Sequence, residues 1–346
     1  MNPLHPTRVI GGRYVVLAEL GRGAMGVVWR AEDRVLRRQV AVKELHLPGG
    51  LSAEERTVFR ERLLREARTP GQLDDPGIVA VYDVLTDQGT EHIVMELVEA
   101  RTLAEVVAAS GPLDEPAATV LGTQLLAALQ VAHRRGVVHG DVKPGNVMLP
   151  ADGSVKLTDL GVAQAADHLP RTATGAVTGS PGYTAPELLD GAVATPAADL
   201  WAVGATLFHA VVGHGPFRRD TTEATVEAVL HGDPPPVHAR GPLGSVITGL
   251  LQRDPQARLS GAQAAALLRS ADTGPAADAP DASVADRLTA SVRQRPRAWI
   301  LAAVGVGLAA GLAVGLALGG GPDAEVRTLT HTADGDGSDA LWTVPR

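Results

Sequence analysis

The chain has 346 residues, no cysteine and a formal net charge of −8. The lack of cysteine excludes disulfide frameworks, thiol catalysis and thiolate–zinc sites, and the acidic balance predicts no nucleic-acid partner. The length accommodates one domain of about 250 residues together with additional segments.

Residues 1–12 are predicted to form a short leader. They contain no basic region followed by an apolar run, so no signal peptide is expected. The folded part of the chain should therefore stay in the cytoplasm.

A strand is expected at residues 13–20, and it continues into residues 21–28, which read G-x-G-x-x-G-x-V. A dinucleotide-binding fold would proceed into a helix, but Val27, Val28 and Trp29 favour a second strand. A strand, a glycine turn and another strand form a hairpin whose backbone amides can approach the phosphates of a nucleotide.

The next expected strand, residues 39–45, is apolar up to Val42 and continues with Lys43. Taken alone, Lys43 is a lysine that snorkels from the end of a strand. After a hairpin of this kind, however, residues 40–43 resemble the V-A-[IV]-K motif of protein kinases, and the resemblance implies that Lys43 contacts the α- and β-phosphates of a nucleotide.

Local signals predict the remaining elements. Ser52 followed by Glu55 is a capping box, which begins a helix over residues 52–68, and Pro116 and Gly136 delimit a long helix at 114–135. Further strands are expected at 78–85 and 92–97, and further helices at 103–107, 199–212 and 262–270.

Residues 139–149 read His-Gly-Asp-Val-Lys-Pro-Gly-Asn-Val-Met-Leu. Asp141, Lys143 and Asn146 occupy a turn between two short apolar strands. A carboxylate, an ammonium and an amide at this spacing supply the base, phosphate clamp and metal ligand of phosphoryl transfer. The segment resembles the catalytic loop of serine/threonine protein kinases, H-x-D-x-K-P-x-N, although Gly140 stands where most kinases carry arginine.

The resemblance covers roughly residues 13–270. The chain is similar to bacterial transmembrane serine/threonine kinases. It implies an α+β, two-lobed protein kinase fold. The N-lobe, about 13–98, is an antiparallel sheet plus one helix, and the C-lobe, about 99–270, is mainly helical. The implied reaction moves the ATP γ-phosphate to protein serine or threonine hydroxyls, and autophosphorylation is expected.

The resemblance also assigns the catalytic roles. Asp141 takes or orients the hydroxyl proton, and Lys143 steadies the γ-phosphate. Asn146 and Asp159, the latter in an Asp-Leu-Gly sequence resembling D-F-G, bind Mg²⁺ or Mn²⁺. Thr184 bridges the catalytic aspartate and lysine.

Lys43 is expected to pair with a glutamate of the N-lobe helix. Glu66 sits where related bacterial kinases place this glutamate, and Glu61 is the alternative. The pairing would orient the lysine toward the α- and β-phosphates.

The implied ATP pocket includes a gatekeeper, Met95, and hinge backbone groups of Glu96 and Val98 that bond the adenine. The residues expected to line it are Leu20, Gly21, Arg22, Gly23, Ala24, Met25, Gly26, Val27, Val28, Ala41, Lys43, Met95, Glu96, Val98 and Met148.

Residues 162–185 are rich in threonine, glycine and alanine and end in the Ala-Pro-Glu motif that closes a kinase activation segment. Thr172 and Thr174 fall where related bacterial kinases are autophosphorylated, and Thr178 and Ser180 are further candidates. Beyond this motif, Asp199 is expected to bond the backbone of the catalytic loop. Glu187 and Arg258 are expected to form a buried pair.

A juxtamembrane linker is predicted at 271–298, because this stretch begins with proline, alanine, aspartate and glycine. Residues 299–318 are then twenty residues without a charge, enough to span a bilayer of about 30 Å as a helix. Arginines precede the segment and acidic residues follow it, so the kinase domain should be cytoplasmic and the tail, 319–346, extracellular. A buried soluble helix is the alternative.

Glycines recur every fourth residue within this segment, which predicts a face for close helix packing and a possible homodimer. They are Gly307, Gly311, Gly315 and Gly319.

Two other function classes fit parts of the pattern. A pseudokinase scaffold would be expected to lack Lys43, Asp141 or Asp159, and all three are present. A small-molecule phosphotransferase on a related fold is disfavoured by Lys143 and by the Ala-Pro-Glu segment. Protein substrates are therefore predicted.

Overall fold

The computed structural model describes residues 8–23, 26–46, 52, 54–55, 57–59, 61, 73, 75–160, 180–237, 239 and 241–271. The predicted membrane span at 299–318 and the tail at 319–346 lie outside these residues, as does all but the first residue of the linker. No helix within the described part is both long enough and apolar enough to cross a membrane.

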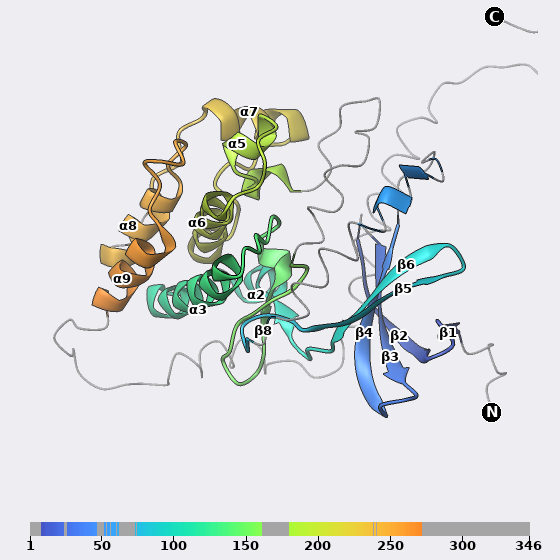
Figure 1. Ribbon diagram of the computed structural model, residues 1–346. Helices are drawn as coiled ribbons and strands as arrows, with labels where there is room; N and C mark the ends of the chain where they lie inside the picture. Colours follow the sequence, from blue (N-terminus) through green and yellow to red (C-terminus); the bar gives the residue numbers. More distant parts are fainter. Residues whose placement is uncertain are drawn as a thin grey trace, which may run out of the picture. The chain divides into compact units, whose positions relative to one another are not determined.

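An antiparallel sheet forms the first half of the described chain (Figure 1). Its strands lie in the order β1-β2-β3-β4-β6-β5, so most neighbours in the sheet are also neighbours in the sequence. Their bounds are β1 Val9–Ile10, β2 Tyr14–Gly23, β3 Gly26–Asp33, β4 Arg38–Leu45, β5 Val81–Asp87 and β6 Thr90–Glu96.

Both faces of this sheet are covered by apolar side chains, as strand β4 illustrates. Val40 and Val42 pack with Tyr14 on one face, whereas Ala41 belongs to the cluster on the other face. Side chains alternate between the faces of a strand, so Lys43 shares the face of Ala41. The alternation therefore directs the lysine to the side that carries the predicted nucleotide pocket.

The predicted capping box is confirmed. The Glu55 amide donates to Ser52 Oγ at 3.1 Å, and the Ser52 amide donates to the Glu55 carboxylate at 2.7 Å. Residues 54, 55, 57–59 and 61 are helical. The rest of the predicted helix, including Glu66, lies outside the described residues.

The strand predicted at 78–85 begins later, at Val81. The residues just before it contact a different segment. Ile78 forms an isolated parallel bridge with Leu157, and the Val79 amide donates to the Leu157 carbonyl at 2.8 Å. The first residues of the apolar run therefore contact Leu157, and the later ones pair with β6. The composition of the run does not show where one partner ends and the other begins.

The second half of the described chain is mainly helical, and a small sheet in the order β7-β8-β9 accompanies it. The predicted helix at 114–135 is confirmed as α3, which Asp114 caps by accepting a hydrogen bond from the Ala117 amide. The bounds are β7 Arg101–Thr102, α2 Leu103–Ser110, α3 Glu115–Arg134, β8 Val147–Leu149, β9 Lys156–Leu157, α5 Pro186–Leu189, α6 Pro196–Val212, α7 Thr222–His231, α8 Gly241–Leu250 and α9 Gly261–Ala271.

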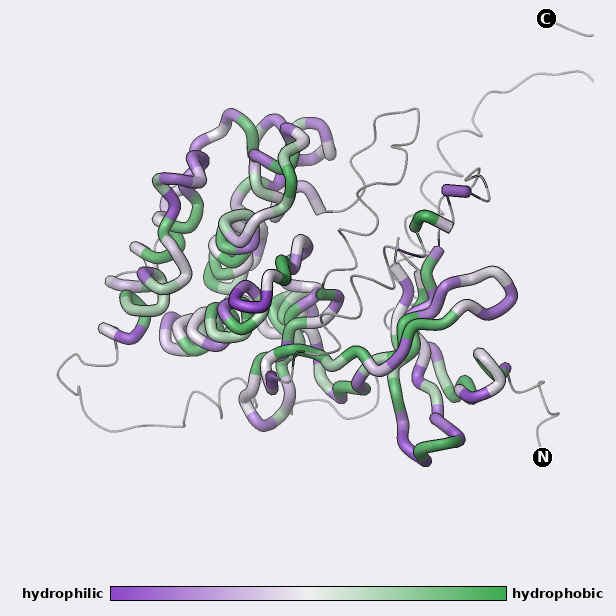
Figure 2. Tube along the Cα trace, viewed as in Figure 1, coloured by the Kyte–Doolittle hydropathy of each residue, from purple (hydrophilic) through white to green (hydrophobic). Residues whose placement is uncertain are grey.

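Helix α6 is the centre of the helical half. It is buried along most of its length and is coloured as mostly apolar in Figure 2. A helix that is apolar around its circumference must be enclosed by other elements, and α6 contacts α3 and α8. Trp201 stacks on Phe217 with ring centroids 5.4 Å apart. This enclosed helix provides a rigid support for the loops beside it.

Candidate active site

Lys43 and Asp159 meet directly. Lys43 Nζ lies 2.8 Å from Asp159 Oδ2, and only 6% of the lysine is exposed. A nearly buried ammonium needs a counter-charge, and the carboxylate supplies it. Asp159 has φ of 65°, a region that costs a non-glycine residue free energy. The pairing of Lys43 with Glu66 stays a prediction, because Glu66 lies outside the described residues.

The residues of the predicted catalytic loop converge on one carboxylate oxygen. Lys143 Nζ is 2.7 Å from Asp141 Oδ2, and Asn146 Nδ2 donates to the same atom at 2.9 Å. Asn146 Nδ2 also donates to the Asp141 backbone carbonyl at 2.8 Å. Both amide hydrogens of Asn146 are therefore engaged, so its Oδ1 is the atom left for a ligand.

Asp199 holds the backbone of this loop, as predicted. It is 1% exposed, and it accepts hydrogen bonds from the amides of His139 and Gly140, each at 2.8 Å. His133 Nε2 lies 2.7 Å from the same carboxylate. A buried carboxylate is tolerated when several donors satisfy it, and this one fixes the position of the loop from α6.

His139 connects the catalytic loop to the segment that carries Asp159. Its Nε2 donates to the Thr158 carbonyl at 3.0 Å, and its Nδ1 accepts from the Asp141 amide at 3.2 Å. These two bonds require the proton on Nε2. The roles of His139 and His133 were missed by the sequence reasoning, since spacing alone does not distinguish an anchoring histidine from a core one.

The glycine hairpin uses its third glycine for a close approach. Gly26 begins β3 with φ of 140°, and an added Cβ would lie 1.8 Å from the Glu44 carbonyl oxygen. Gly21 and Gly23 meet no atom within 4 Å of such a Cβ. Gly26 is therefore required by the neighbouring strand, whereas the open surroundings of the first two glycines leave room for a nucleotide.

The predicted adenine pocket is assembled from separate elements. Val28, Ala41, Met95, Val98 and Met148 belong to one apolar cluster, although they come from β3, β4, β6, the segment after β6, and β8. Sequence positions up to 120 residues apart are thus brought together. Of the remaining predicted pocket residues, Leu20 is 45% exposed and Arg22 pairs with Glu19 at the surface, whereas Ala24 and Met25 lie outside the described residues.

Glu96 has a contact that the sequence did not suggest. Its two carboxylate oxygens accept from Lys156 Nζ at 2.7 and 2.9 Å, which links the end of β6 to β9. The Glu96 amide donates to the Ala80 carbonyl at 2.8 Å, so this amide is not available to a nucleotide.

The remaining predicted residues lie around the start of α5, apart from Arg258, which lies between α8 and α9. The predicted ion pair is confirmed: Arg258 Nη1 and Nη2 lie 2.7 and 3.0 Å from the Glu187 carboxylate. Thr184 is expected to bridge Asp141 and Lys143. These two residues contact each other directly, and the bridging role of Thr184 stays a prediction. Ser180 is described and half-buried, and its phosphorylation also stays a prediction. Thr172, Thr174 and Thr178 lie outside the described residues.

Tyr183, directly before Thr184, is bonded to α6. Its hydroxyl lies 2.9 Å from His209 Nδ1. Burial raises the pKa of Tyr183 to about 12, and burial together with the nearby His214 and Arg218 lowers the pKa of His209. The pair is therefore neutral near pH 7.

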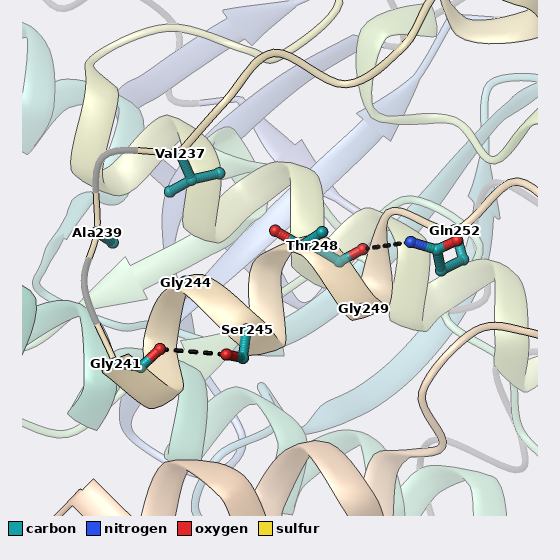
Figure 3. A pocket seen from close by; sticks show the side chains of 8 residues that line it. All are labelled: Val237, Ala239, Gly241, Gly244, Ser245, Thr248, Gly249 and Gln252. Atoms are coloured by element: carbon teal, nitrogen blue, oxygen red, sulfur yellow. Dashed lines mark hydrogen bonds between the residues drawn. The ribbon is translucent and has the colours of Figure 1, made fainter.

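A separate open groove of about 550 Å³ lies along α8 (Figure 3). Its described lining residues carry no titratable group, and its polar groups are engaged locally: Ser245 donates to the Gly241 carbonyl and Gln252 to the Thr248 carbonyl. The groove therefore offers no catalytic chemistry.

Known proteins resemble this chain in sequence. Residues 14–269 match the protein kinase domain family. The serine/threonine-protein kinase PknA of Mycobacterium tuberculosis is 40% identical over 233 residues, which are 66% of this chain and 53% of that protein. PrkC of Bacillus subtilis is 38% identical over 222 residues, 64% of this chain and 33% of that protein.

The chain thus spans about half, or less, of the length of these curated relatives. The family match nevertheless covers most of the chain, including every paired residue of the site. The chain therefore belongs to the protein kinase family.

Proposed function

We propose that the chain is a serine/threonine protein kinase that transfers the γ-phosphate of ATP to protein hydroxyls, its own included. The observation that carries the proposal is the Asp141 carboxylate, whose Oδ2 is engaged by Lys143 at 2.7 Å and Asn146 at 2.9 Å. A carboxylate held in this way presents its other oxygen to a substrate hydroxyl, where it can accept or orient the proton.

Two lysines provide charge for the phosphates: Lys143 beside Asp141 and Lys43 beside Asp159. Lys143 neutralises charge that develops on the transferred γ-phosphate, and Lys43 neutralises the α- and β-phosphates. Transfer of this kind needs mainly positioning and electrostatic stabilisation. The contacts of Asp199 with the catalytic loop supply the positioning.

The residues present fit a divalent cation. Asp159 offers a carboxylate and Asn146 an amide oxygen, and both are hard oxygen donors suited to Mg²⁺. The described residues contain no group of three or more acidic, histidine or cysteine side chains that could hold a metal. Two protein donors suffice for Mg²⁺, which keeps waters and substrate phosphates as its other ligands. Asp159 and Asn146 would hold the ion, and it would supply positive charge that neutralises the phosphates of ATP.

The test is phosphate incorporation by the full-length chain. It is incubated with labelled ATP, Mg²⁺ and a generic protein substrate, beside an Asp141→Asn variant that preserves side-chain size. Label on the substrate or on the chain itself, absent from the variant, is expected. If the wild-type chain gives no more label than the Asp141→Asn variant, on either the substrate or the chain itself, the result would instead favour a scaffold that binds nucleotide without turnover.

A membrane location is the second part of the proposal and rests on the sequence. The uncharged residues 299–318 would cross the membrane once, with the kinase domain cytoplasmic and the tail extracellular. Protease added to intact cells checks this orientation: the tail should be cleaved and the kinase domain protected, and an accessible kinase domain would contradict it. Energy transfer between copies carrying Gly311→Ile and Gly315→Ile tests the homodimer, and unchanged association would exclude this glycine face.

A further inference from the structure

The surroundings of Tyr183 are basic. Its hydroxyl is enclosed on one side by His209, with ring centroids 6.2 Å apart, and on another by Gly215, whose added Cβ would lie 3.2 Å from that hydroxyl. The Arg218 amide donates to the Gly215 carbonyl. This turn places the Arg218 backbone beside Gly215, and the Arg218 side chain is exposed to solvent.

His214 completes the cluster. Its ring packs against Phe208 with centroids 6.0 Å apart. His214 and Arg218 act electrostatically on His209, and Arg218 acts on Tyr183. Among the described residues, no carboxylate contributes to the pKa of either Tyr183 or His209. A phenol, two imidazoles and a guanidinium thus lie on neighbouring segments of the described chain.

The cluster lies at a defined distance from the catalytic loop. Asp199 and His209 are both on α6, ten residues apart, which corresponds to about 15 Å along a helix. Asp199 holds the catalytic loop and His209 holds Tyr183. An extended peptide rises about 3.3 Å per residue, so four or five residues cover this distance.

We propose that Tyr183, His209, His214 and Arg218 form a subsite that binds an acidic side chain of the protein substrate, within about five residues of the phosphorylated hydroxyl. The inference rests on the proposed kinase activity. Arg218 supplies the charge. The Tyr183–His209 pair retains one hydrogen-bond donor for the acidic group, whichever of the two donates in their mutual bond. His214 borders the subsite, and its Nδ1–H is already engaged by the Gly215 carbonyl at 3.0 Å. Because the guanidinium is exposed, the expected preference for glutamate over lysine is modest, roughly five- to tenfold in kcat/KM.

The test uses the full-length chain and peptides with one threonine acceptor. Glutamate, glutamine or lysine is placed at each position from five before to five after the acceptor. The wild-type chain is expected to favour glutamate at one or more of these positions. Arg218→Glu should reverse that preference, and Arg218→Gln should reduce it toward equality even if the charge reversal impairs folding.

Arg219→Glu is the matched control, because it makes the same change of charge at the neighbouring exposed arginine. It should retain the preference for glutamate. Equal use of glutamate and lysine peptides by the wild-type chain would overturn the subsite, as would an equal effect of the two charge reversals. If no peptide is labelled above the Asp141→Asn background, the kinase proposal itself fails and the subsite with it.

Discussion

The Gly140 amide donates a 2.8 Å hydrogen bond to Asp199 Oδ1 while Gly140 has φ of 79°. Glycine adopts this left-handed backbone without a steric penalty, whereas other residues do not. Gly140, which stands where most kinases carry arginine, is therefore the residue best suited to the backbone conformation at this position.

Gly140→Ala should lower the free energy of unfolding by about 1 kcal/mol, because the added Cβ disfavours the positive φ. Urea denaturation measures the change. Gly145→Ala is the matched control in the same loop, since Gly145 does not have a positive φ and its added Cβ would meet no atom within 4 Å. Equal destabilisation by both substitutions would contradict the explanation.

Combining Thr172→Ala with Thr174→Ala should reduce kcat/KM by less than about tenfold, or roughly 1.4 kcal/mol. An arginine at position 140 would offer a guanidinium to a phosphorylated activation segment, and glycine offers none. Steady-state kinetics on a peptide substrate measure the loss. A reduction of a hundredfold or more would show that another basic group, such as Arg171, provides the coupling.

Asp199→Asn should reduce kcat on the order of 10- to 100-fold with little change in KM for ATP, because misplacing a catalytic group is costly. Asparagine keeps the size but turns an amide donor toward His133 and the two backbone amides, which are donors themselves. Steady-state kinetics against both substrates separate the two parameters. Asp190→Asn, at an exposed aspartate, should leave both unchanged, and a raised KM with normal kcat in Asp199→Asn would refute the positioning role.

Stability should fall on acidification below about pH 6.5. Burial lowers the pKa of His92 and of His209 from the ordinary value of 6.5. The unfolded chain then binds more protons than the folded one as the pH falls through that value, so stability is present above it and is lost below. Thermal unfolding between pH 7.5 and 5.5 measures this loss of stability. The loss should be smaller in the His92→Gln variant.

The control for this experiment is His231→Gln, because the His231 side chain is 68% exposed. It should leave the pH profile unchanged. A profile that is flat in the wild-type chain would contradict the expected contribution of the buried histidines.

Local signals were sufficient for much of the fold. The Ser52–Glu55 capping box and the helix after Asp114 form as predicted, because their determinants lie within a few residues of one another. The contacts of His133 with Asp199 and of Tyr183 with His209 were not predictable in this way. They join residues 66 and 26 positions apart, and spacing rules describe only near neighbours.

The contact between Glu96 and Lys156 joins the predicted nucleotide pocket to the segment that carries Asp159, the predicted metal ligand. Glu96 ends β6, beside the predicted adenine pocket, and Lys156 lies three residues before Asp159. A compound that displaces Glu96 would shift Asp159 as well, so its binding and that of a divalent cation should be thermodynamically coupled. Such coupling is reciprocal, and the affinity of a competitive inhibitor should consequently depend on the concentration of Mg²⁺.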